Sequence, residues 1–299
     1  MTQAWDSKFS NWARSPSTTE MQRIQNTETQ IRAAISKNPA LQNRSITVFT
    51  QGSYRNRVNV RADSDIDIAV VCYDTFFPEY PDDNVRKSLT EVNVPATYTY
   101  ATFKNELEAA LVARFGRAEV TRGSKAFDIK ANTQRVNADV VAFFEHRRYY
   151  ANGNYISGVE MIPDNGVQAR IRNWPQQHYD QGVAKNDLTK RRFKSVVRIL
   201  KTLSNRMAED GIASAKIVPS FLIECLVFNA ENRCFDKNSY FDMVRAVLAN
   251  THNNTLKVET CSEWGEVSEL KYLFRNSQPW TVGQANKFLD DAWNYIGYK

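Results

Sequence analysis

Apolar residues recur with two different periods along the chain, and the change of period separates a strand-rich half from a helix-rich half. A first helix is predicted to begin at the capping sequence Ser17-Thr18-Thr19-Glu20 and to end at Asn38-Pro39. Short alternating or continuous apolar runs follow, and these predict strands. The predicted strands cover residues 46–49, 65–72, 118–120, 127–130 and 136–144, with a long loop at 73–94 and a helix at 98–115.

From about residue 151 glycine and proline mark loops, and helical spacing dominates beyond them. Helices are predicted at residues 189–207, 219–229, 240–249 and 282–296, the last opening with a capping box at Thr281-Val282-Gly283-Gln284. We therefore predict an α+β fold. Residues 1–165 form a core of a mixed sheet flanked by helices, residues 166–299 form a helical lobe, and a ligand binds in a cleft between the two lobes.

Composition narrows the classes of protein that this chain can represent. A chain of 299 residues that is 42% hydrophobic can build a sizeable core. No apolar run is long enough to span a membrane, and the N-terminus lacks a signal-peptide pattern, so a cytoplasmic protein without membrane partners is predicted. The 4 cysteines and 3 histidines are scattered, which argues against disulfides and against zinc or histidine metal sites. The net charge of +6 suits phosphate ligands, either nucleotides or nucleic acid.

The most informative segment is Asp65-Ile66-Asp67, at the head of an apolar strand. Side chains alternate faces along a strand, so both carboxylates point the same way while Ile66 points into the core. Two carboxylates this close repel each other, and divalent cations relieve the repulsion. Shortly before them, Gln51-Gly52-Ser53 follows another strand, and its backbone amides and hydroxyl can hold phosphate oxygens.

A third acid that could join Asp65 and Asp67 is Asp139, because it lies in a strongly apolar strand where an acid without a partner is costly. Pairing of Asp139 with Arg135 is the alternative interpretation of this residue, and Asp128 is the alternative third acid. On the helix predicted at 190–207, basic residues fall on one face. That face is either solvated or a phosphate clamp, and it contains Arg191, Lys194, Arg198 and Lys201.

The Gly-Ser turn followed by Asp-x-Asp resembles the DNA polymerase β-like nucleotidyltransferase superfamily. The order of the segments Asn173–His178, Gly182–Asn186, Arg192–Lys201 and Pro219–Glu224 is similar to that in the bacterial cGAS/DncV-like nucleotidyltransferases. This resemblance covers about residues 17–295. It implies a polymerase β-like core with a C-terminal helical lobe around an active-site cleft, and the synthesis of cyclic oligonucleotide second messengers in anti-phage (CBASS) defence.

The resemblance also implies roles for single residues. Gly52 and Ser53 match the turn that holds the donor phosphates, although Arg57-Val58 replaces the small polar residue usual there. Asp65, Asp67 and Asp139 match the catalytic, metal-binding acids. The nucleotide-binding matches in the helical lobe are Lys201 and Ser220 for the triphosphate, with Lys194 on the same basic face, and Phe221 for stacking on a base. From the residues alone, Ser220 after Pro219 is alternatively a helix cap, and Phe221 is alternatively a core residue.

The implied reaction uses nucleoside triphosphates and two Mg²⁺ or Mn²⁺ ions, and no nucleic-acid template. A monomer is expected to make a product that a separately encoded effector protein reads. Asn173 is a candidate for reading a pyrimidine base, since its amide offers a donor and an acceptor to a uracil edge; a turn residue before Pro175 is the alternative. The rival functions are RNA tailing of the poly(A) or CCA type, an aminoglycoside-type nucleotidyltransferase, and an inactive nucleotide-binding relative.

Overall fold

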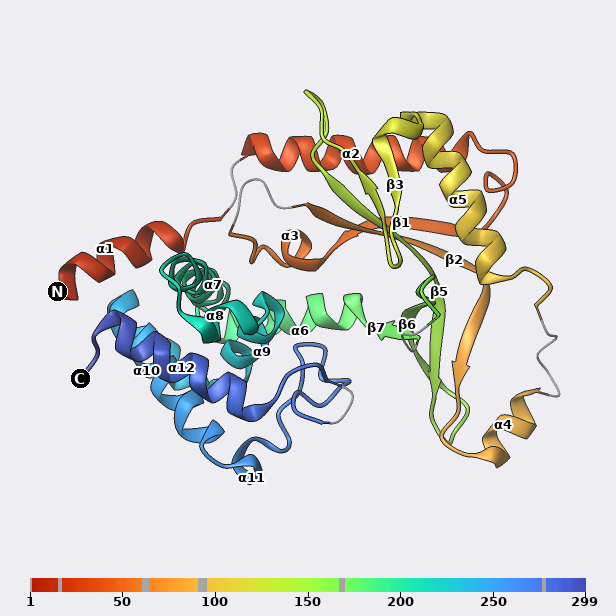
Figure 1. Ribbon diagram of the computed structural model, residues 1–299. Helices are drawn as coiled ribbons and strands as arrows, with labels where there is room; N and C mark the ends of the chain where they lie inside the picture. Colours follow the sequence, from red (N-terminus) through yellow and green to blue (C-terminus); the bar gives the residue numbers. More distant parts are fainter. Residues whose placement is uncertain (1, 16–17, 61–64, 91–95, 167–169, 276–277) are drawn as a thin grey trace. The chain divides into compact units, whose positions relative to one another are not determined.

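The computed structural model describes residues 2–15, 18–60, 65–90, 96–166, 170–275 and 278–299 (Figure 1), and its contacts divide the chain into two compact units. The sheet unit consists of Ser17–Arg55 and Arg61–Pro175. The helical unit consists of Met1–Pro16, Asn56–Val60 and Gln176–Lys299. The boundary at residues 175 and 176 lies ten residues beyond the predicted one at 165 and 166, and residues 1–16 group with the helices instead of the sheet.

The described residues of the sheet unit form one seven-stranded mixed sheet. Its strands are β1 (Ile46–Gln51), β2 (Ile66–Glu79), β3 (Val120–Arg122), β4 (Phe127–Ile129), β5 (Ala138–Tyr149), β6 (Tyr155–Met161) and β7 (Ile171–Asn173). The main path runs β1-β2-β5-β4-β3, while β6 pairs with the distal part of β5 and β7 pairs with β6 (Figure 1). β2 and β5 are parallel, and the other pairs are antiparallel.

The central strands are apolar because helices cover them. Helix α2 (Thr18–Ser36) contacts β1, α5 (Tyr100–Phe115) contacts β5, and the two helices contact each other. Their buried side chains join those of β2 and β5 in one core, in which Phe103 and Leu107 are fully buried. The sheet unit also contains α3 (Gly52–Asn56, its last residue in the helical unit), α4 (Asp83–Thr90) and the short 3-10 helix η1 (Arg117–Glu119).

Two predictions for this unit were wrong. The loop predicted at residues 73–94 instead contains the end of β2 and α4, and residues 91–95 lie outside the described residues. β2 continues through a bulge between Cys72 and Phe76 because β5 offers a partner strand as far as Arg148. The loop predicted beyond residue 151 contains β6, since Gly158 lies within a paired strand.

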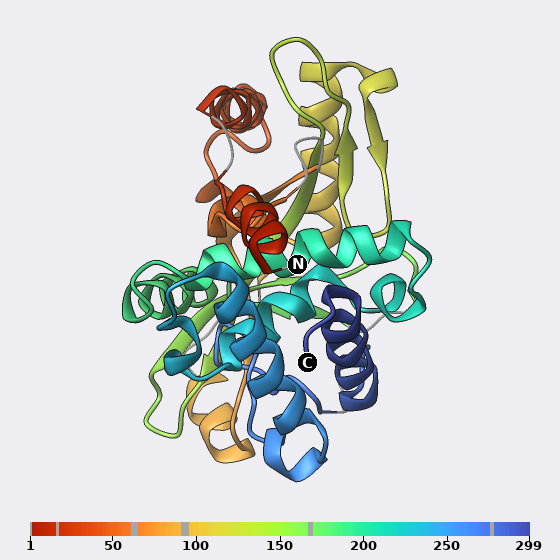
Figure 2. The same ribbon diagram turned by 90° about the vertical axis from the view of Figure 1, so that its left-hand side faces the viewer.

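The helical unit is built around α7 (Phe193–Glu209). Its other helices are α1 (Thr2–Trp12), α6 (Pro175–Leu188, entering from the sheet unit), α8 (Ala213–Ile217), α9 (Ser220–Asn229), η2 (Asn232–Phe235), α10 (Tyr240–Thr255), α11 (Val258–Cys261) and α12 (Val282–Ile296). Figure 2 shows α7 from the side, with α10 and α12 packed against each other and in contact with it. The predicted capping box at Thr281 and Gln284 is confirmed.

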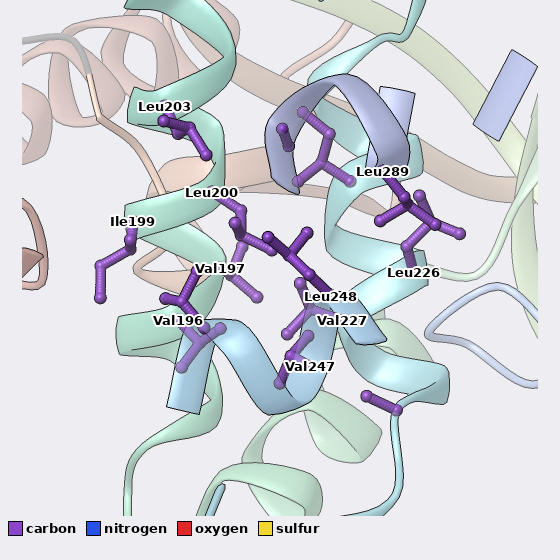
Figure 3. Close-up of a cluster of buried hydrophobic side chains, with 14 of the residues drawn as sticks. Val196, Val197, Ile199, Leu200, Leu203, Leu226, Val227, Val247, Leu248 and Leu289 are labelled. Carbon is purple, nitrogen blue, oxygen red and sulfur yellow. The ribbon is translucent and has the colours of Figure 1, made fainter. Parts of the chain in front are cut away.

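The core of the helical unit explains why residues 1–16 belong to it. Val196, Leu200 and Leu203 of α7 lie among apolar side chains from α9, α10 and α12 (Figure 3). Phe9 of α1 is fully buried in the same core, and α1 contacts both α7 and α10. Within the described residues, every helix is too short or too polar to cross a membrane.

Candidate active site

Four polar residues form a row across four neighbouring strands of the sheet. Asp67 of β2 pairs with Gln51 of β1 on one side and with Asp139 of β5 on the other. Asp139 in turn pairs with Asp128 of β4. Directly paired residues project from the same face of a sheet, with about 5 Å between neighbouring strands. The predicted acids Asp67 and Asp139 are therefore brought together, and Asp128, predicted only as an alternative, lies beside them.

Two carboxylates of this row, those of Asp67 and Asp139, are destabilised in their charged form. Burial, together with the Asp65 carboxylate, raises the pKa of Asp67 to about 6. Burial and the carboxylates of Asp128, Asp67 and Asp65 raise the pKa of Asp139 to about 6. Arg135 does not compensate Asp139, because its guanidinium lies 3.3 Å from the carboxylate of Glu119. The proposed Arg135–Asp139 pair is thus absent, and the row carries excess negative charge.

The donor set of the row suits divalent cations, although no group of three His, Cys, Asp or Glu side chains in the described ranges is close enough to hold an ion. Carboxylate oxygens are the ligands that Mg²⁺ and Mn²⁺ prefer. No described cation forms an ion pair with Asp65, Asp67 or Asp139. Because like charges repel, a divalent cation bound among these carboxylates would relieve their repulsion. By donor chemistry these three residues fit the expected metal ligands, and Asp65 is exposed at the head of β2.

Position 52 favours glycine for two physical reasons. It begins α3 directly after β1 with φ +67°, a left-handed conformation that disfavours other residues. A Cβ atom at this position would also lie 2.2 Å from Oδ2 of Asp67. The Gly52-Ser53 turn thus lies directly against the carboxylate row, as a turn that serves the same ligand must. Ser53 is partly exposed.

The basic face predicted for residues 190–207 is only partly realised. Helix α7 begins at Phe193, and Arg191 precedes it with φ +63°. Arg198 is 5% exposed, and its guanidinium donates to the carbonyl oxygens of Ala13 and Arg57, so it holds two backbone segments of the helical unit. The prediction of a continuous cationic stripe is wrong, because Arg198 and Lys201 turn into the core instead of toward solvent.

Lys201 is paired in the interior. Its Nζ lies 2.8 Å from Oε2 of Glu224 on α9, and Nε2 of His178 on α6 lies 2.9 Å from Oε1 of the same carboxylate. Although burial alone raises the pKa of Glu224, Lys201 and His178 together lower it to about 2. Lys201 therefore shares its charge with Glu224, and an incoming phosphate would have to compete with this carboxylate. Neither His178 nor Glu224 was singled out from the sequence, since their pairing depends on the packing of three helices.

Lys194 has the opposite environment. Burial, aided by the positive charges of Arg57 and Arg198, lowers the pKa of Lys194 even though Glu224 acts in the other direction. No described carboxylate is within ion-pair distance of its ammonium group, which lies 5.5 Å from the ring centroid of Tyr179. A half-buried cation among other cations is relieved by an anion. Among the predicted basic residues of α7, Lys194 therefore has surroundings in which an anion would be favourable.

Ser220 and Phe221 open α9. Pro219 occupies the N-cap position, and the Ser220 side chain makes no capping hydrogen bond, so the alternative of a simple helix cap is not realised. Ser220 is exposed. Phe221 is partly buried, with its ring 5.9 Å from that of Trp280 and 5.8 Å from that of His178. It packs against the core on one part of the ring and keeps another part accessible.

Asn173 is the last residue of β7, immediately before buried Trp174 and the start of α6. It pairs with Val159 of β6, and Val159 pairs with Glu145 of β5. Glu145 lies six residues beyond Asp139 on the same strand, an even spacing, so Asn173 projects from the same face as the carboxylate row. The alternative of a turn residue does not hold, because Asn173 is the exposed end of a strand on the same face as the carboxylate row.

Comparison with known proteins assigns this fold and site to a class. The model of the cGAS/DncV-like nucleotidyltransferase C-terminal helical domain matches residues 180–297. The chain is 39% identical to a cyclic dipyrimidine nucleotide synthase, CdnE, from Cecembia lonarensis and 41% identical to one from Legionella pneumophila, each over 98% of both chains. The chain belongs to the cGAS/DncV-like nucleotidyltransferases.

Solved structures agree with this assignment. The CdnE cyclic dinucleotide synthase of Elizabethkingia meningoseptica, determined with GTP and Apcpp, superposes with a TM-score of 0.81 at 34% identity, covering 98% of this chain and 99% of that one. The c-UMP-AMP synthase of Rhodothermus marinus superposes with a TM-score of 0.85 at 27% identity, over 98% of each chain. The predicted fold class and the predicted activity, a nucleotidyltransferase that makes cyclic nucleotides, are confirmed at this level.

Proposed function

We propose that this protein joins two nucleoside triphosphates, at least one of them a pyrimidine nucleotide, into a cyclic dinucleotide. The observation that carries the proposal is the pairing of Asp67 with Asp139 across β2 and β5, on the face that also presents Asn173. The two curated relatives at 39% and 41% identity are named for dipyrimidine products, which supports the choice of bases.

In this proposal Asp65, Asp67 and Asp139 would hold two divalent cations, whose charge would lower the pKa of the acceptor ribose hydroxyl and neutralise the charge of the leaving pyrophosphate. The hydroxyl oxygen forms a bond to the α-phosphorus of the donor, its proton leaves to solvent, and the bond to pyrophosphate breaks. A second transfer of the same kind closes the ring. The protein contributes alignment and fixed charge and supplies no nucleophile of its own.

The remaining predicted residues supply nucleotide contacts. Gln51, Gly52 and Ser53 adjoin the carboxylate row and would hold donor phosphates through backbone and hydroxyl groups. In the helical unit, Lys194 would contact phosphate oxygens directly, because its ammonium has no described carboxylate partner. Further phosphate contacts would come from Ser220 and from Lys201, which shares its charge with Glu224, and the accessible part of Phe221 would stack on a base.

The product would leave a monomeric enzyme for a separately encoded effector protein. Size-exclusion chromatography with light scattering measures whether the enzyme is a monomer. A monomer mass with full activity is expected, and a stable dimer would contradict this part of the proposal.

The proposed function is tested by incubating the purified protein with all four ribonucleoside triphosphates and Mg²⁺ or Mn²⁺, followed by phosphatase treatment and mass spectrometry. We expect a phosphatase-resistant cyclic mass that contains uridine or cytidine and is lost in Asp65→Asn. Asp83→Asn is the control, since Asp83 is an exposed acid paired only with Arg86. A ladder of linear products would instead indicate an RNA-tailing enzyme, and a purine-only ring would overturn the assignment of bases.

The base reader is tested in the same assay. Asn173→Ala removes the amide that would pair with a pyrimidine edge. We expect the pyrimidine share of the product to fall at least tenfold while the enzyme continues to form phosphodiester bonds. An unchanged product ratio would exclude Asn173 as the base reader.

A further inference from the structure

A cluster of polar side chains with a buried centre lies on the face of the sheet opposite Asn173. His146 of β5 is fully buried, with Nδ1 2.7 Å from Oε2 of Glu160 and Nε2 3.1 Å from Oε2 of Glu79. Nη1 of Arg172 lies 2.9 Å from Oε2 of Glu79. The cluster thus joins polar side chains from β2, β5, β6 and β7.

Strand register places this cluster directly behind Asn173. Glu160 pairs with Arg172, and the next pair along these two strands is Val159 with Asn173. Neighbouring residues on a strand point to opposite faces, so Arg172 faces the cluster while Asn173 faces the side of the carboxylate row. β7 has only three residues and pairs only with β6 among the described strands (Figure 1). A strand this short holds its position poorly by backbone pairing alone.

The segment after Asn173 is fixed by close packing. A Cβ atom on Gly158 of β6 would lie 2.7 Å from the carbonyl oxygen of Asn173 and 2.7 Å from Nε1 of Trp174. The Trp174 ring is 2% exposed and meets His146 edge-on at 5.4 Å. The guanidinium of Arg148 lies 4.1 Å over this ring and donates to Glu79 at 3.2 Å. Only glycine at position 158 permits this approach.

We propose that the cluster of His146, Glu160, Glu79 and Arg172, with Trp174 seated over Gly158, is a positioning device that sets the orientation of Asn173 and thereby the choice of base. Burying the Glu160 carboxylate beside the His146 imidazole is expensive unless the carboxylate has partners, and on β7 its partner is Arg172, the residue next to Asn173, at 3.7 Å. These residues touch no substrate themselves. The inference rests on the proposed function, because it presupposes that Asn173 reads a base.

The test compares the product ratio and the KM values for UTP and ATP in Gly158→Ala and Glu160→Gln with those in Asn173→Ala. Gly283→Ala is the control for adding a methyl group, since a Cβ there meets no atom closer than 4.0 Å. Glu108→Gln is the control for neutralising an arginine-paired acid of the same unit. We expect both test variants to raise the KM for UTP at least tenfold relative to that for ATP, with kcat changed less than threefold.

The outcomes separate the two proposals. If Asn173→Ala shifts the base ratio while Gly158→Ala and Glu160→Gln keep the wild-type ratio, the positioning role is overturned and the proposed function stands. If Asn173→Ala itself leaves the ratio unchanged, the base reader is wrong and the positioning role falls with it. A uniform loss of kcat with every nucleotide would show that the cluster is only structural.

If Gly158→Ala or Glu160→Gln does not fold, a substitution of a more exposed residue of the cluster is used instead. Arg172→Gln removes one charge from a side chain that is 41% exposed, so the core is left intact. Thermal unfolding confirms that this variant is folded, and its UTP and ATP KM values then decide the question. A UTP-selective rise in KM supports positioning, and equal changes for both nucleotides exclude it.

Discussion

Acidic side chains have opposite surroundings in the two units. In the sheet unit, Asp67 and Asp139 stand side by side without a described cation, and their pKa values are raised to about 6. In the helical unit, Glu224 is more deeply buried, yet Lys201 and His178 lower its pKa to about 2. A buried charge with its partner stabilises the fold, whereas charges gathered without partners indicate where a ligand of opposite charge binds.

The comparison also distinguishes lysines of one helix. Lys201 and Lys194 lie two turns apart on α7, but only Lys201 has a carboxylate partner among the described residues. Sequence spacing assigns both to a single basic face, and packing gives them different surroundings. The predictions below test whether partnered and unpartnered charges differ in function, from the largest effect to the smallest.

Replacing Asp67 by Asn should abolish product while the fold persists. The amide cannot supply the charge that holds a cation beside Asp139, so turnover should fall about 1,000-fold or more. Mass spectrometry of the cyclic product measures the loss, and thermal unfolding verifies the fold. Activity within tenfold of wild type would show that the row is not catalytic.

Breaking the buried pair of the helical unit should instead act on stability. Glu224→Gln leaves the Lys201 ammonium buried without a counter-charge, which costs about 3–5 kcal/mol of unfolding free energy. Urea unfolding measures this loss of unfolding free energy. The exposed pair of Arg206 and Glu209 is the control, and Glu209→Gln should cost about 0.5 kcal/mol or less. Equal losses in both variants would mean that Glu224 contributes no more than a surface acid.

The stability of the helical unit should also depend on pH, because the Glu224 carboxylate becomes protonated at low pH. A lowered pKa in the folded state means that its contribution is present above the ordinary carboxyl pKa of about 4.5 and is lost as the pH falls toward 2. Glu224→Gln should lack this acid-dependent loss, and unfolding curves from pH 5 to pH 2.5 provide the measurement.

Neutralising Lys194 should weaken nucleotide binding. Lys194→Met removes a cation placed for a phosphate, so we expect the KM for nucleoside triphosphates to rise about tenfold, corresponding to about 1.4 kcal/mol. Lys190→Met is the control, because Lys190 is exposed and paired with Asp236. Should both variants leave KM unchanged, the helical unit would bind phosphates through other residues.

The smallest effect concerns pH and the carboxylate row. Because the pKa values of Asp67 and Asp139 are raised, the folded state holds protons that the unfolded chain has released between pH 4 and pH 6. Stability without metal should therefore fall as the pH rises across this window, and Mg²⁺ should restore it above pH 6. Thermal unfolding across this pH range, with and without Mg²⁺, measures both. A flat profile would contradict the electrostatic account of the row.

Much of the fold and the centre of the site could be predicted from local sequence. The apolar runs around Asp67 and Asp139 predict two strands, and the resemblance to the polymerase β-like nucleotidyltransferases implies that these strands are neighbours. The helix at 282–296 is predicted within its observed bounds because its cap and its apolar stripe agree. Such features depend on neighbours along the chain.

Other features depend on neighbours in space. The extension of β2 past Asp74 exists only because β5 is long enough to pair with it. The burial of Arg198 follows from two carbonyl groups contributed by distant segments. The cluster around His146 draws single residues from four strands, so no short motif identifies it.

The pairing of Asp67 with Asp139 also bears on how the protein acquires its activity during synthesis. The two residues are 72 positions apart (139 minus 67), and they meet only across the parallel pair of β2 and β5. Parallel pairing of distant segments closes a long loop and is slow to form. A nascent or partly folded chain therefore lacks the adjacent carboxylates. It acquires them only when residue 139 has been synthesised and β5 has joined the sheet.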